Sequence, residues 1–163
     1  MRRTLVCESL SVMFSLCGVT LLQGAGLLPG TRETLAQFET GATRPTRCAA
    51  DLAVGSHKEI SRYQILPSVW RDYSRTKSFQ DPNVAWTVTQ RILRDREAEF
   101  RRATGREWDA VDLYLMWNAP GVYRRAQWNR AKVSHVVLDR AKRFDSLMQE
   151  RVRIDSSSML ARN

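Results

Sequence analysis

The longest run of helical periodicity lies in residues 81–105, where apolar side chains recur at a spacing of four residues. Asp81 is a favourable helix N-cap, Pro82 is tolerated in the first turn, and Gly105 is a favourable stop. The apolar stripe consists of Val84, Val88 and Ile92. We therefore predict a long amphipathic helix across this stretch.

Two further stretches with helical spacing follow. Residues 113–117 are apolar on nearly all sides, which predicts a helix that is buried in the centre of the fold and ends at Pro120 and Gly121. Residues 131–152 predict a second long amphipathic helix. One face of that helix carries Val133, Val137, Ala141, Phe144 and Met148. We expect the chain to fray beyond it, from Ser156 to Asn163.

The region that precedes these helices is less regular. Thr31 is a suitable N-cap and Gly41 a suitable stop, which predicts a short helix over residues 31–40. Residues 42–61 are rich in Gly, Ala, Thr and Arg and have no helical periodicity. This composition predicts a loop region or a small irregular lobe.

The apolar run over residues 61–70 contains a polar residue, Gln64, whose place is not explained by burial. Pro67 would break a helix that ran through it and would interrupt the centre of a strand. It fits the first turn of a new helix, where its missing N–H costs nothing. We expect Ile65 and Trp70 to face the core on either side of it.

Strand signals are few and the chain contains no internal repeats. The fold class is therefore mainly α, with a buried central helix wrapped by two amphipathic helices and with a small irregular lobe. The 163 residues fit one domain, and a hydrophobic content of 43% is enough for a packed core, which excludes general disorder.

The N-terminus resembles a secretory signal peptide. Arg2 and Arg3 precede a long apolar stretch that ends in small residues, and Glu8 is an unusual charge within it. We expect cleavage between Gly24 and Gly30, which would leave no stable membrane span; the alternatives are an uncleaved anchor and a buried first helix. The chain then divides into residues 1–28 as the signal, 29–152 as the folded domain and 153–163 as a frayed tail.

The net charge of +9 favours a polyanionic partner. For an exported protein, a cell-wall polymer or an anionic membrane surface fits this charge better than nucleic acid does. Much of the charge lies in residues 91–102 and 140–144, where acids and bases alternate at helical spacing. Solvated helix faces are the simpler interpretation of those two stretches.

Cysteine and histidine offer little chemistry. Cys7 and Cys17 lie in the predicted signal, which leaves Cys48 as a free and buried thiol. His57 should be exposed in the irregular lobe, and His135 should be partly buried on its helix. Because nucleophile motifs and metal-ligand spacings are absent from the sequence, we expect no metal and no cofactor.

Glu39 is the residue whose position suggests acid chemistry. It lies at the end of the short predicted helix, whose preceding face is apolar, directly before a glycine turn. Partial desolvation there would raise the pKa of the carboxyl and keep it protonated as a general acid near neutral pH. A surface glutamate at a helix end is the alternative interpretation.

Three segments carry a family resemblance. They read AQFETGA (36–42), SRYQILPSVW (61–70) and LYLMWNAPGVY (113–123). In this order they resemble the lysozyme-like lytic transglycosylases, which cleave peptidoglycan and share a fold with goose-type lysozyme. The match covers residues 29–147 and departs from the family pattern in Ser61, where glycine is common, and in the inverted pair Pro120–Gly121.

The resemblance implies a lysozyme-like fold and a reaction with one acid. Glu39 would protonate the glycosidic oxygen between N-acetylmuramic acid and N-acetylglucosamine and would then remove the proton of the muramic 6-hydroxyl, which gives a 1,6-anhydro product. The substrate's acetamido group would stabilise the oxocarbenium-like centre. A hydrolase would need a second acid to hold water, for which Glu59 is the candidate; Asp51 behind it is interpreted as a solvated loop carboxylate.

The resemblance also implies a sugar-binding cleft, in which aromatic faces pack on sugar rings and amides bind acetamido groups. The expected lining residues are Tyr63, Gln64, Trp117, Asn118 and Tyr123. The other tryptophans, at positions 70, 86, 108 and 128, are interpreted as core or groove-rim residues.

The function expected from these features is that of a monomeric peptidoglycan-cleaving enzyme in the periplasm or outside the cell, which binds glycan strands and no nucleic acid. A lysozyme-like hydrolase and a lysozyme-like peptidoglycan-binding protein without turnover are the alternatives. A basic helical nucleic-acid-binding protein is a third class, and the predicted signal peptide argues against it.

Overall fold

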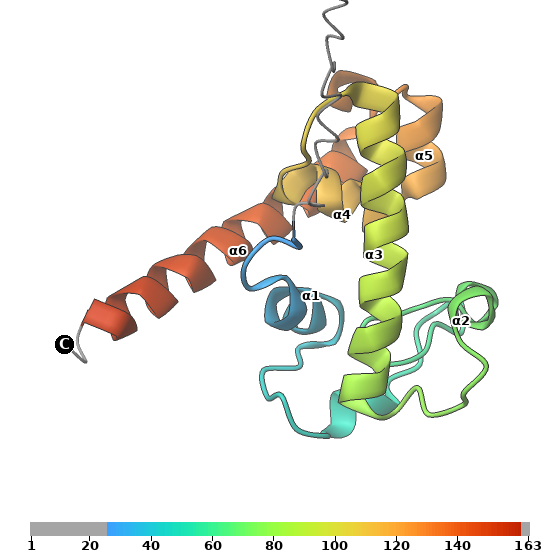
Figure 1. The fold of residues 1–163 in the computed structure, drawn as a ribbon, viewed down its shortest axis with the longest axis vertical. Helices are drawn as coiled ribbons and strands as arrows, with labels where there is room; N and C mark the ends of the chain where they lie inside the picture. Colours follow the sequence, from blue (N-terminus) through green and yellow to red (C-terminus); the bar gives the residue numbers. More distant parts are fainter. Residues whose placement is uncertain (1–25, 161–163) are drawn as a thin grey trace, which may run out of the picture.

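The computed structural model describes residues 26–160, which form an assembly of helices (Figure 1). The elements are α1 (Thr31–Thr40), the 3-10 helix η1 (Ala49–Leu52), α2 (Pro67–Tyr73), α3 (Pro82–Thr104), α4 (Ala110–Asn118), α5 (Pro120–Arg125), the 3-10 helix η2 (Arg130–Lys132) and α6 (His135–Leu160). Residues 26–160 contain no β-strand, only an isolated antiparallel bridge between Ile60 and Ile65. The prediction of a mainly α fold is confirmed.

The predicted signal sequence over residues 1–28 falls almost entirely outside the described residues. Among the helices between residues 26 and 160, none combines the length and the apolar character that a membrane crossing requires.

Helix α4 is the buried central helix that the sequence predicts. Its residues from Ala110 to Trp117 are all buried, and it packs against α3, α5 and α6. The helix begins at a capping box, in which the Asp109 carboxylate accepts a hydrogen bond from the backbone N–H of Asp112 (3.0 Å). A helix that is apolar on all sides must be enclosed by other elements, and this requirement places α4 at the centre.

The ends of α3 are also as predicted. The Asp81 carboxylate accepts hydrogen bonds from the backbone N–H groups of Asn83 and Val84, Pro82 occupies the first turn, and Gly105 ends the helix at φ 70°. Figure 1 shows α3 as the long upright helix beside α4 and α5. The helix therefore presents its apolar stripe to the core over most of its length.

Helix α1 has the predicted bounds but a different N-cap. Gly30 occupies the cap position, and the Thr31 hydroxyl donates to the carbonyl of Leu28 rather than capping the helix. Gly41 ends α1 in the left-handed conformation, at φ 73°. A residue with a Cβ would be strained there, so this glycine fixes the point at which the chain leaves the helix.

Helix α4 ends just before Pro120, as predicted, but the sequence analysis did not predict that the segment after it is helical. Pro120 and Gly121 do not end the helical region but start a new helix, α5, which has Pro120 in its first turn. Proline fits this position because its absent N–H has no partner in a first turn. The chain therefore turns at Ala119 and continues as helix with almost no intervening loop.

Helix α6 also differs at both ends. It begins at His135, so Val133 precedes it, and His135 is exposed rather than partly buried. The expected frayed tail is helical as far as Leu160, and the Ser156 and Ser157 hydroxyls donate to the carbonyls four residues before them. Figure 1 shows the second half of α6 extending away from the rest of the molecule.

A buried ion pair organises the irregular lobe between α1 and α2. Asp51 was expected to be a solvated carboxylate, but it is 1% exposed, and Arg62 donates to both of its oxygens (2.6 Å each). Arg62 also donates to the carbonyls of Arg44 (2.7 Å) and Thr46 (2.9 Å). One guanidinium thus joins three segments of a lobe that has little regular structure. Cys48 is free and half-buried beside this pair.

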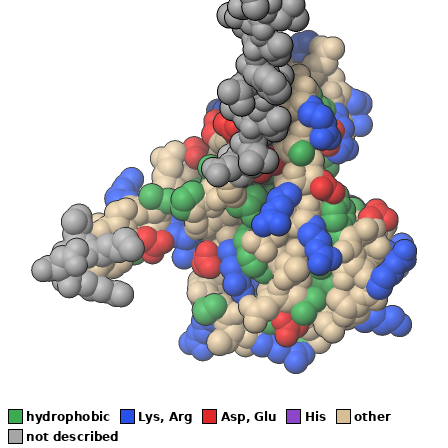
Figure 2. Space-filling model, in the orientation of Figure 1, with side chains coloured by type: hydrophobic (Ala, Val, Ile, Leu, Met, Phe, Trp, Pro, Cys, Tyr) green, Lys and Arg blue, Asp and Glu red, His purple; other side chains and the backbone are tan. Residues whose placement is uncertain are grey.

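The tryptophans take the expected core and rim positions. Trp70 and Trp108 are buried, and Trp86 and Trp128 are partly buried against the core. Most charged side chains lie outside this core, and the buried exceptions are Asp51, Arg62, Glu97 and Asp112. Figure 2 shows Lys and Arg spread over the visible face rather than gathered in one patch. This distribution agrees with solvated helix faces on the side shown.

We predict that Asp51→Asn destabilises the fold, because it leaves the buried Arg62 guanidinium without its counter-charge. The free energy of unfolding, measured by urea denaturation, should fall by about 3–5 kcal/mol. The control is Glu107→Gln, which breaks a pair with Arg101 (2.9 Å) in which Glu107 is 56% exposed. It should cost no more than about 1 kcal/mol, and similar losses in both variants would contradict the role of the buried pair.

Candidate active site

Glu39 lies in the last turn of α1, where it meets α4 and α6. The Tyr114 hydroxyl donates to Glu39 Oε1 (2.8 Å), and Arg140 Nη2 donates to Oε2 (3.2 Å). The side chain of Glu39 is 7% exposed. The adjacent Phe38 packs edge-on against the rings of Tyr114 (5.0 Å between centroids) and Phe144 (5.6 Å), which fixes the end of α1 against both helices.

The environment raises the pKa of Glu39 above its ordinary value. Burial raises it most, and the hydrogen bond from Tyr114 and the charge of Arg140 oppose the rise without cancelling it. The negative charge of Glu59 adds to the rise. The direction is the one that the position of Glu39 predicts, and the carboxyl is shifted towards its neutral, proton-donating form.

Glu39 faces a cleft of about 450 Å³. The walls come from α1, the irregular lobe, α2, α3, the end of α4, the start of α5 and α6. The predicted site residues that line it are Glu39, Glu59, Gln64, Trp117 and Asn118. Residues from all three sequence motifs therefore meet in one cavity.

Gln64 reaches the cleft because the chain makes a tight turn there. Ile60 and Ile65 exchange both backbone hydrogen bonds (2.8 and 2.9 Å), and Gln64 has φ 51° in the turn between them. Its amide Nε2 donates to the carbonyl of Ser61 (3.2 Å). The position of this polar residue is therefore explained by the turn, which aims the amide at the cleft while Ile65 is buried.

Glu59 lies on the same wall and is held by the loop before it. Its carboxylate accepts a hydrogen bond from the backbone N–H of His57 (2.8 Å), and the His57 ring lies 3.3 Å away. Burial acts to raise the pKa of Glu59. The opposing contributions are larger, so the pKa lies below its usual value: they are hydrogen bonds from the backbone of Glu59 and His57 and from the His57 ring, and the charge of His57. The two cleft carboxyls thus have pKa values shifted in opposite directions.

Gly55 lies beside the ends of the Glu59 and Gln64 side chains, which would have to shift to admit a side chain at position 55. A Cβ at this position would clash with Glu59 Oε2 and with Gln64 Oε1. Both cleft side chains therefore pack directly over the main chain of the lobe.

The end of α4 supplies Trp117 and Asn118. Trp117 is 8% exposed, and Asn118 is exposed as the last residue of the helix. Arg96 of α3 donates to the carbonyls of Met116 (2.7 Å) and Trp117 (2.8 Å), and its guanidinium lies over the Trp117 ring (5.4 Å). Burial lowers the pKa of Arg96 to about 10. Arg96 therefore holds the helix end that carries both cleft residues.

Two predicted site residues are not in the cleft. Tyr63 is 1% exposed and packs against Trp86 (5.8 Å), because its side chain leaves the turn on the core side while Gln64 leaves it on the cleft side. Tyr123 is fully buried in α5, and its hydroxyl donates to Asp112 Oδ1 (2.6 Å). The prediction that both tyrosines line the cleft is wrong.

Tyr114 and Arg140 are the site residues that sequence reasoning missed. Arg140 was included in a charge-rich stretch interpreted as a solvated face. It follows Val137 by three residues and precedes Phe144 by four, so it borders the apolar face of α6. This position on the helix could have identified Arg140 as a site residue. No such signal marks Tyr114, because it lies in a helix that is apolar on nearly all sides.

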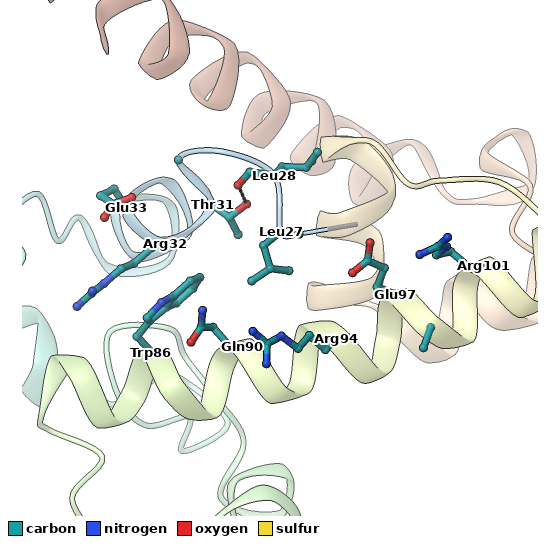
Figure 3. Close-up of a pocket in the computed structure, with 13 residues that line it drawn as sticks. Leu27, Leu28, Thr31, Arg32, Glu33, Trp86, Gln90, Arg94, Glu97 and Arg101 are labelled. Carbon is teal, nitrogen blue, oxygen red and sulfur yellow. Dashed lines mark hydrogen bonds between the residues drawn. The ribbon is translucent and has the colours of Figure 1, made fainter. Parts of the chain in front are cut away.

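A larger hollow, of about 640 Å³, lies between α3 and the chain that leads into α1. Figure 3 shows Trp86, Gln90 and Glu97 projecting from α3 towards the segment that carries Leu27 and Leu28. None of the predicted site residues lines this hollow. The larger hollow also has a buried carboxyl with a raised pKa, Glu97, beside Gln90 and Trp86. The smaller cleft is the candidate active site because residues of all three sequence motifs line it.

Within residues 26–160, no group of three or more His, Cys, Asp or Glu side chains is arranged to hold a metal ion. Comparisons of the chain with protein-family models, with curated proteins and with solved structures found no match. The family resemblance remains a prediction, based on the three sequence motifs.

We predict that Glu39→Gln stabilises the protein increasingly as the pH rises. Because the folded state holds the Glu39 proton more tightly than the unfolded state does, ionisation of Glu39 weakens folding. This penalty is absent below about pH 4 and grows as the pH rises through the raised pKa. Unfolding free energies of wild type and variant, measured between pH 4 and pH 8, should diverge in favour of the variant.

The control for this experiment is Glu33→Gln, which removes an exposed carboxylate from the first turn of the same helix. It should show no stabilisation that grows with pH. A constant or narrowing difference between wild type and Glu39→Gln would contradict the raised pKa.

Proposed function

We propose that this protein is a lytic transglycosylase with a lysozyme-like fold, which cleaves the β-1,4 bond between N-acetylmuramic acid and N-acetylglucosamine in peptidoglycan. One observation carries the proposal: Glu39 is a buried carboxyl with a raised pKa, and it opens on a cleft that also contains Gln64, Trp117 and Asn118. These residues come from three separate motifs and line one cavity, which supports the proposal.

Glu39 acts first as an acid in the proposed reaction. Its proton passes to the glycosidic oxygen as the bond to the anomeric carbon breaks, and the freed N-acetylglucosamine end leaves as an alcohol. The substrate's acetamido group stabilises the positive charge that develops at the anomeric carbon. The Tyr114 hydroxyl, 2.8 Å from Oε1, stabilises the carboxylate that remains.

Glu39 then acts as a base. The carboxylate removes the proton of the muramic 6-hydroxyl, whose oxygen bonds to the anomeric carbon and closes a 1,6-anhydro ring. The carboxyl is protonated again at the end, so the cycle needs no water, metal or cofactor. A single acid whose pKa is raised by burial suits both steps, because it binds and releases a proton within one cavity.

The cleft offers suitable groups for the sugar. Asn118 is exposed at the end of α4, and the Gln64 amide is held in the cleft by the turn that contains it. Both can bind acetamido groups of the glycan strand. Trp117 is 8% exposed and lines the cleft, which supports a contact with the glycan strand.

The presence of Glu59 in the cleft supports a hydrolase as the second candidate. Its pKa is lowered while that of Glu39 is raised, which is the division expected of a base and an acid. However, its oxygens are already engaged by His57, which supports a structural role in the loop. We therefore rank the transglycosylase first and an inactive peptidoglycan-binding protein after both.

We further propose that the protein acts after export, in the periplasm or outside the cell, as a monomer that contacts glycan strands. The basic side chains on the face drawn in Figure 2 are dispersed, which favours this view over a nucleic-acid-binding surface.

The predicted effect of Glu39→Gln is a loss of at least about 100-fold in the release of soluble fragments from purified peptidoglycan, because an amide cannot donate the proton. The control, Glu33→Gln, should retain wild-type release. Liquid chromatography with mass spectrometry measures the products. Equal release by wild type and Glu39→Gln would exclude the catalytic role of Glu39, and release by neither would favour the binding protein.

The products distinguish the two enzymatic candidates. A transglycosylase releases fragments that end in 1,6-anhydro-muramic acid, which are lighter by one water than the reducing fragments that a hydrolase releases. We expect the anhydro product, and we expect Glu59→Gln to keep forming it. If wild type released fragments with reducing ends and Glu59→Gln did not, the hydrolase would be established instead.

A further inference from the structure

Arg140 has a partly unused guanidinium at the mouth of the cleft. Its Nε donates to the Tyr114 hydroxyl (2.7 Å) and its Nη2 donates to Glu39 Oε2 (3.2 Å). Within residues 26–160, Nη1 donates to no protein acceptor. The side chain is 43% exposed and lines the cleft, so the unused N–H groups are accessible from the cavity.

Aromatic packing holds this guanidinium in place. It lies over the rings of Phe38 (5.7 Å to the centroid) and Tyr114 (5.9 Å). The other arginine of the cleft, Arg96, is committed to the end of α4 by its two carbonyl partners. Arg140 is therefore the cleft arginine that can offer a two-pronged contact to an anion without releasing a structural element.

The contact with Arg140 affects how readily Glu39 holds its proton. The groups that face Glu39 are Tyr114 from α4, Arg140 from α6 and Glu59 from the lobe; His57 and Arg96 also line the cleft. Arg140 favours the ionised form of Glu39 and so opposes the burial that keeps the acid protonated. An anion bound to the guanidinium would offset its charge and would so leave Glu39 more fully protonated.

We propose that Arg140 binds a carboxylate of the glycan strand and that this contact releases Glu39 to act as the acid. The inference rests on the proposed function, because it assigns a role in the same cleft. Arg140 is then a residue that determines specificity: it favours anionic strands over neutral ones of the same sugar length. Tyr114 stays with Glu39 throughout and keeps the carboxyl oriented.

Peptidoglycan has two kinds of carboxylate that Arg140 could bind. One is the lactyl group of muramic acid, which is free where no peptide is attached; the other is a carboxylate of the attached peptide. Chitin oligosaccharides have the same acetamido sugars and no carboxylate. These three substrates therefore separate the two sources from each other and from the neutral backbone.

The test compares wild type, Arg140→Gln and Arg140→Lys on peptide-free glycan strands, peptide-bearing strands and chitin oligosaccharides. Arg140→Gln should raise KM for a carboxylate-bearing strand about tenfold, the effect of losing one charge-assisted hydrogen bond. KM for chitin oligosaccharides should not change. Arg140→Lys should restore most of the preference for anionic strands because it keeps the charge.

The matched control is Arg143→Gln, one turn further along α6, which removes the same charge from an exposed position outside the cleft. It should leave KM unchanged for all three substrates. Thermal unfolding of each variant by circular dichroism shows whether a loss of activity reflects loss of fold.

The pH profile tests the release of Glu39. In wild type, the alkaline limb of kcat should lie at higher pH on the carboxylate-bearing strand than on chitin oligosaccharides, because the bound anion occupies Arg140. In Arg140→Gln the two limbs should coincide. Coincident limbs in wild type, or an equal rise of KM on anionic and neutral substrates in Arg140→Gln, would overturn the proposal.

Binding measurements separate failure of this inference from failure of the proposed function. If wild type releases no product from any of the three substrates, the proposed function fails, and calorimetry with the peptide-free strands and chitin oligosaccharides decides the role of Arg140. Tighter binding of the anionic strand that is lost in Arg140→Gln supports the anion contact. Equal affinities in both proteins overturn it.

Discussion

The enclosure of α4 is the constraint on which the rest of the structure depends. The helix is buried on all sides, so each polar group on it needs a partner from another element. The fully buried Asp112 is paired by Arg106 and Arg130, which, with the Tyr123 hydroxyl, hold its pKa low although burial acts to raise it. At the other end Arg96 binds the last carbonyls. Between them, Tyr114 presents its hydroxyl to Glu39, so the helix that forms the core also orients the candidate acid.

The irregular lobe depends on electrostatics where the helical part depends on apolar packing. The lobe has little secondary structure to hold its backbone. The Asp51–Arg62 pair connects three stretches of it instead, namely the chain around residues 44–46, the chain at Asp51 and the chain at Arg62. Glu59 and Gln64 lie in the same lobe and line the cleft. The geometry of this cleft wall therefore depends on a buried ion pair rather than on a helix. The cleft therefore lies between two parts of the molecule that are stabilised by different forces.

The helices and half of the site could be predicted because their signals are local. The stop at Gly41 identified the end of α1, the cap and the stop of α3 identified both of its ends, and the continuous apolar run identified α4. Glu39, Gln64, Trp117 and Asn118 were placed by motif, and they do meet. The wrong predictions for Tyr63 and Tyr123 concern the direction in which these side chains point. Whether Tyr63 or Gln64 faces the cleft depends on the φ values of one turn, and Tyr123 is drawn to Asp112 by a contact that no local pattern encodes. The burial of Asp51 and the position of Arg140 likewise depend on partners that are distant in sequence.

The turn that carries Gln64 has a further consequence. Ser61 and Gln64 both have positive φ values, 65° and 51°, which cost a residue with a Cβ roughly 1–2 kcal/mol each. Glycine at position 64 would relax the backbone, but it would also remove the amide from the cleft. With Gln64 the folded protein is therefore less stable than it would be with glycine at this position. This loss of stability accompanies the placement of the Gln64 amide in the cavity. Selection for stability alone would act against Gln64, and a requirement for the amide in the cleft would preserve it.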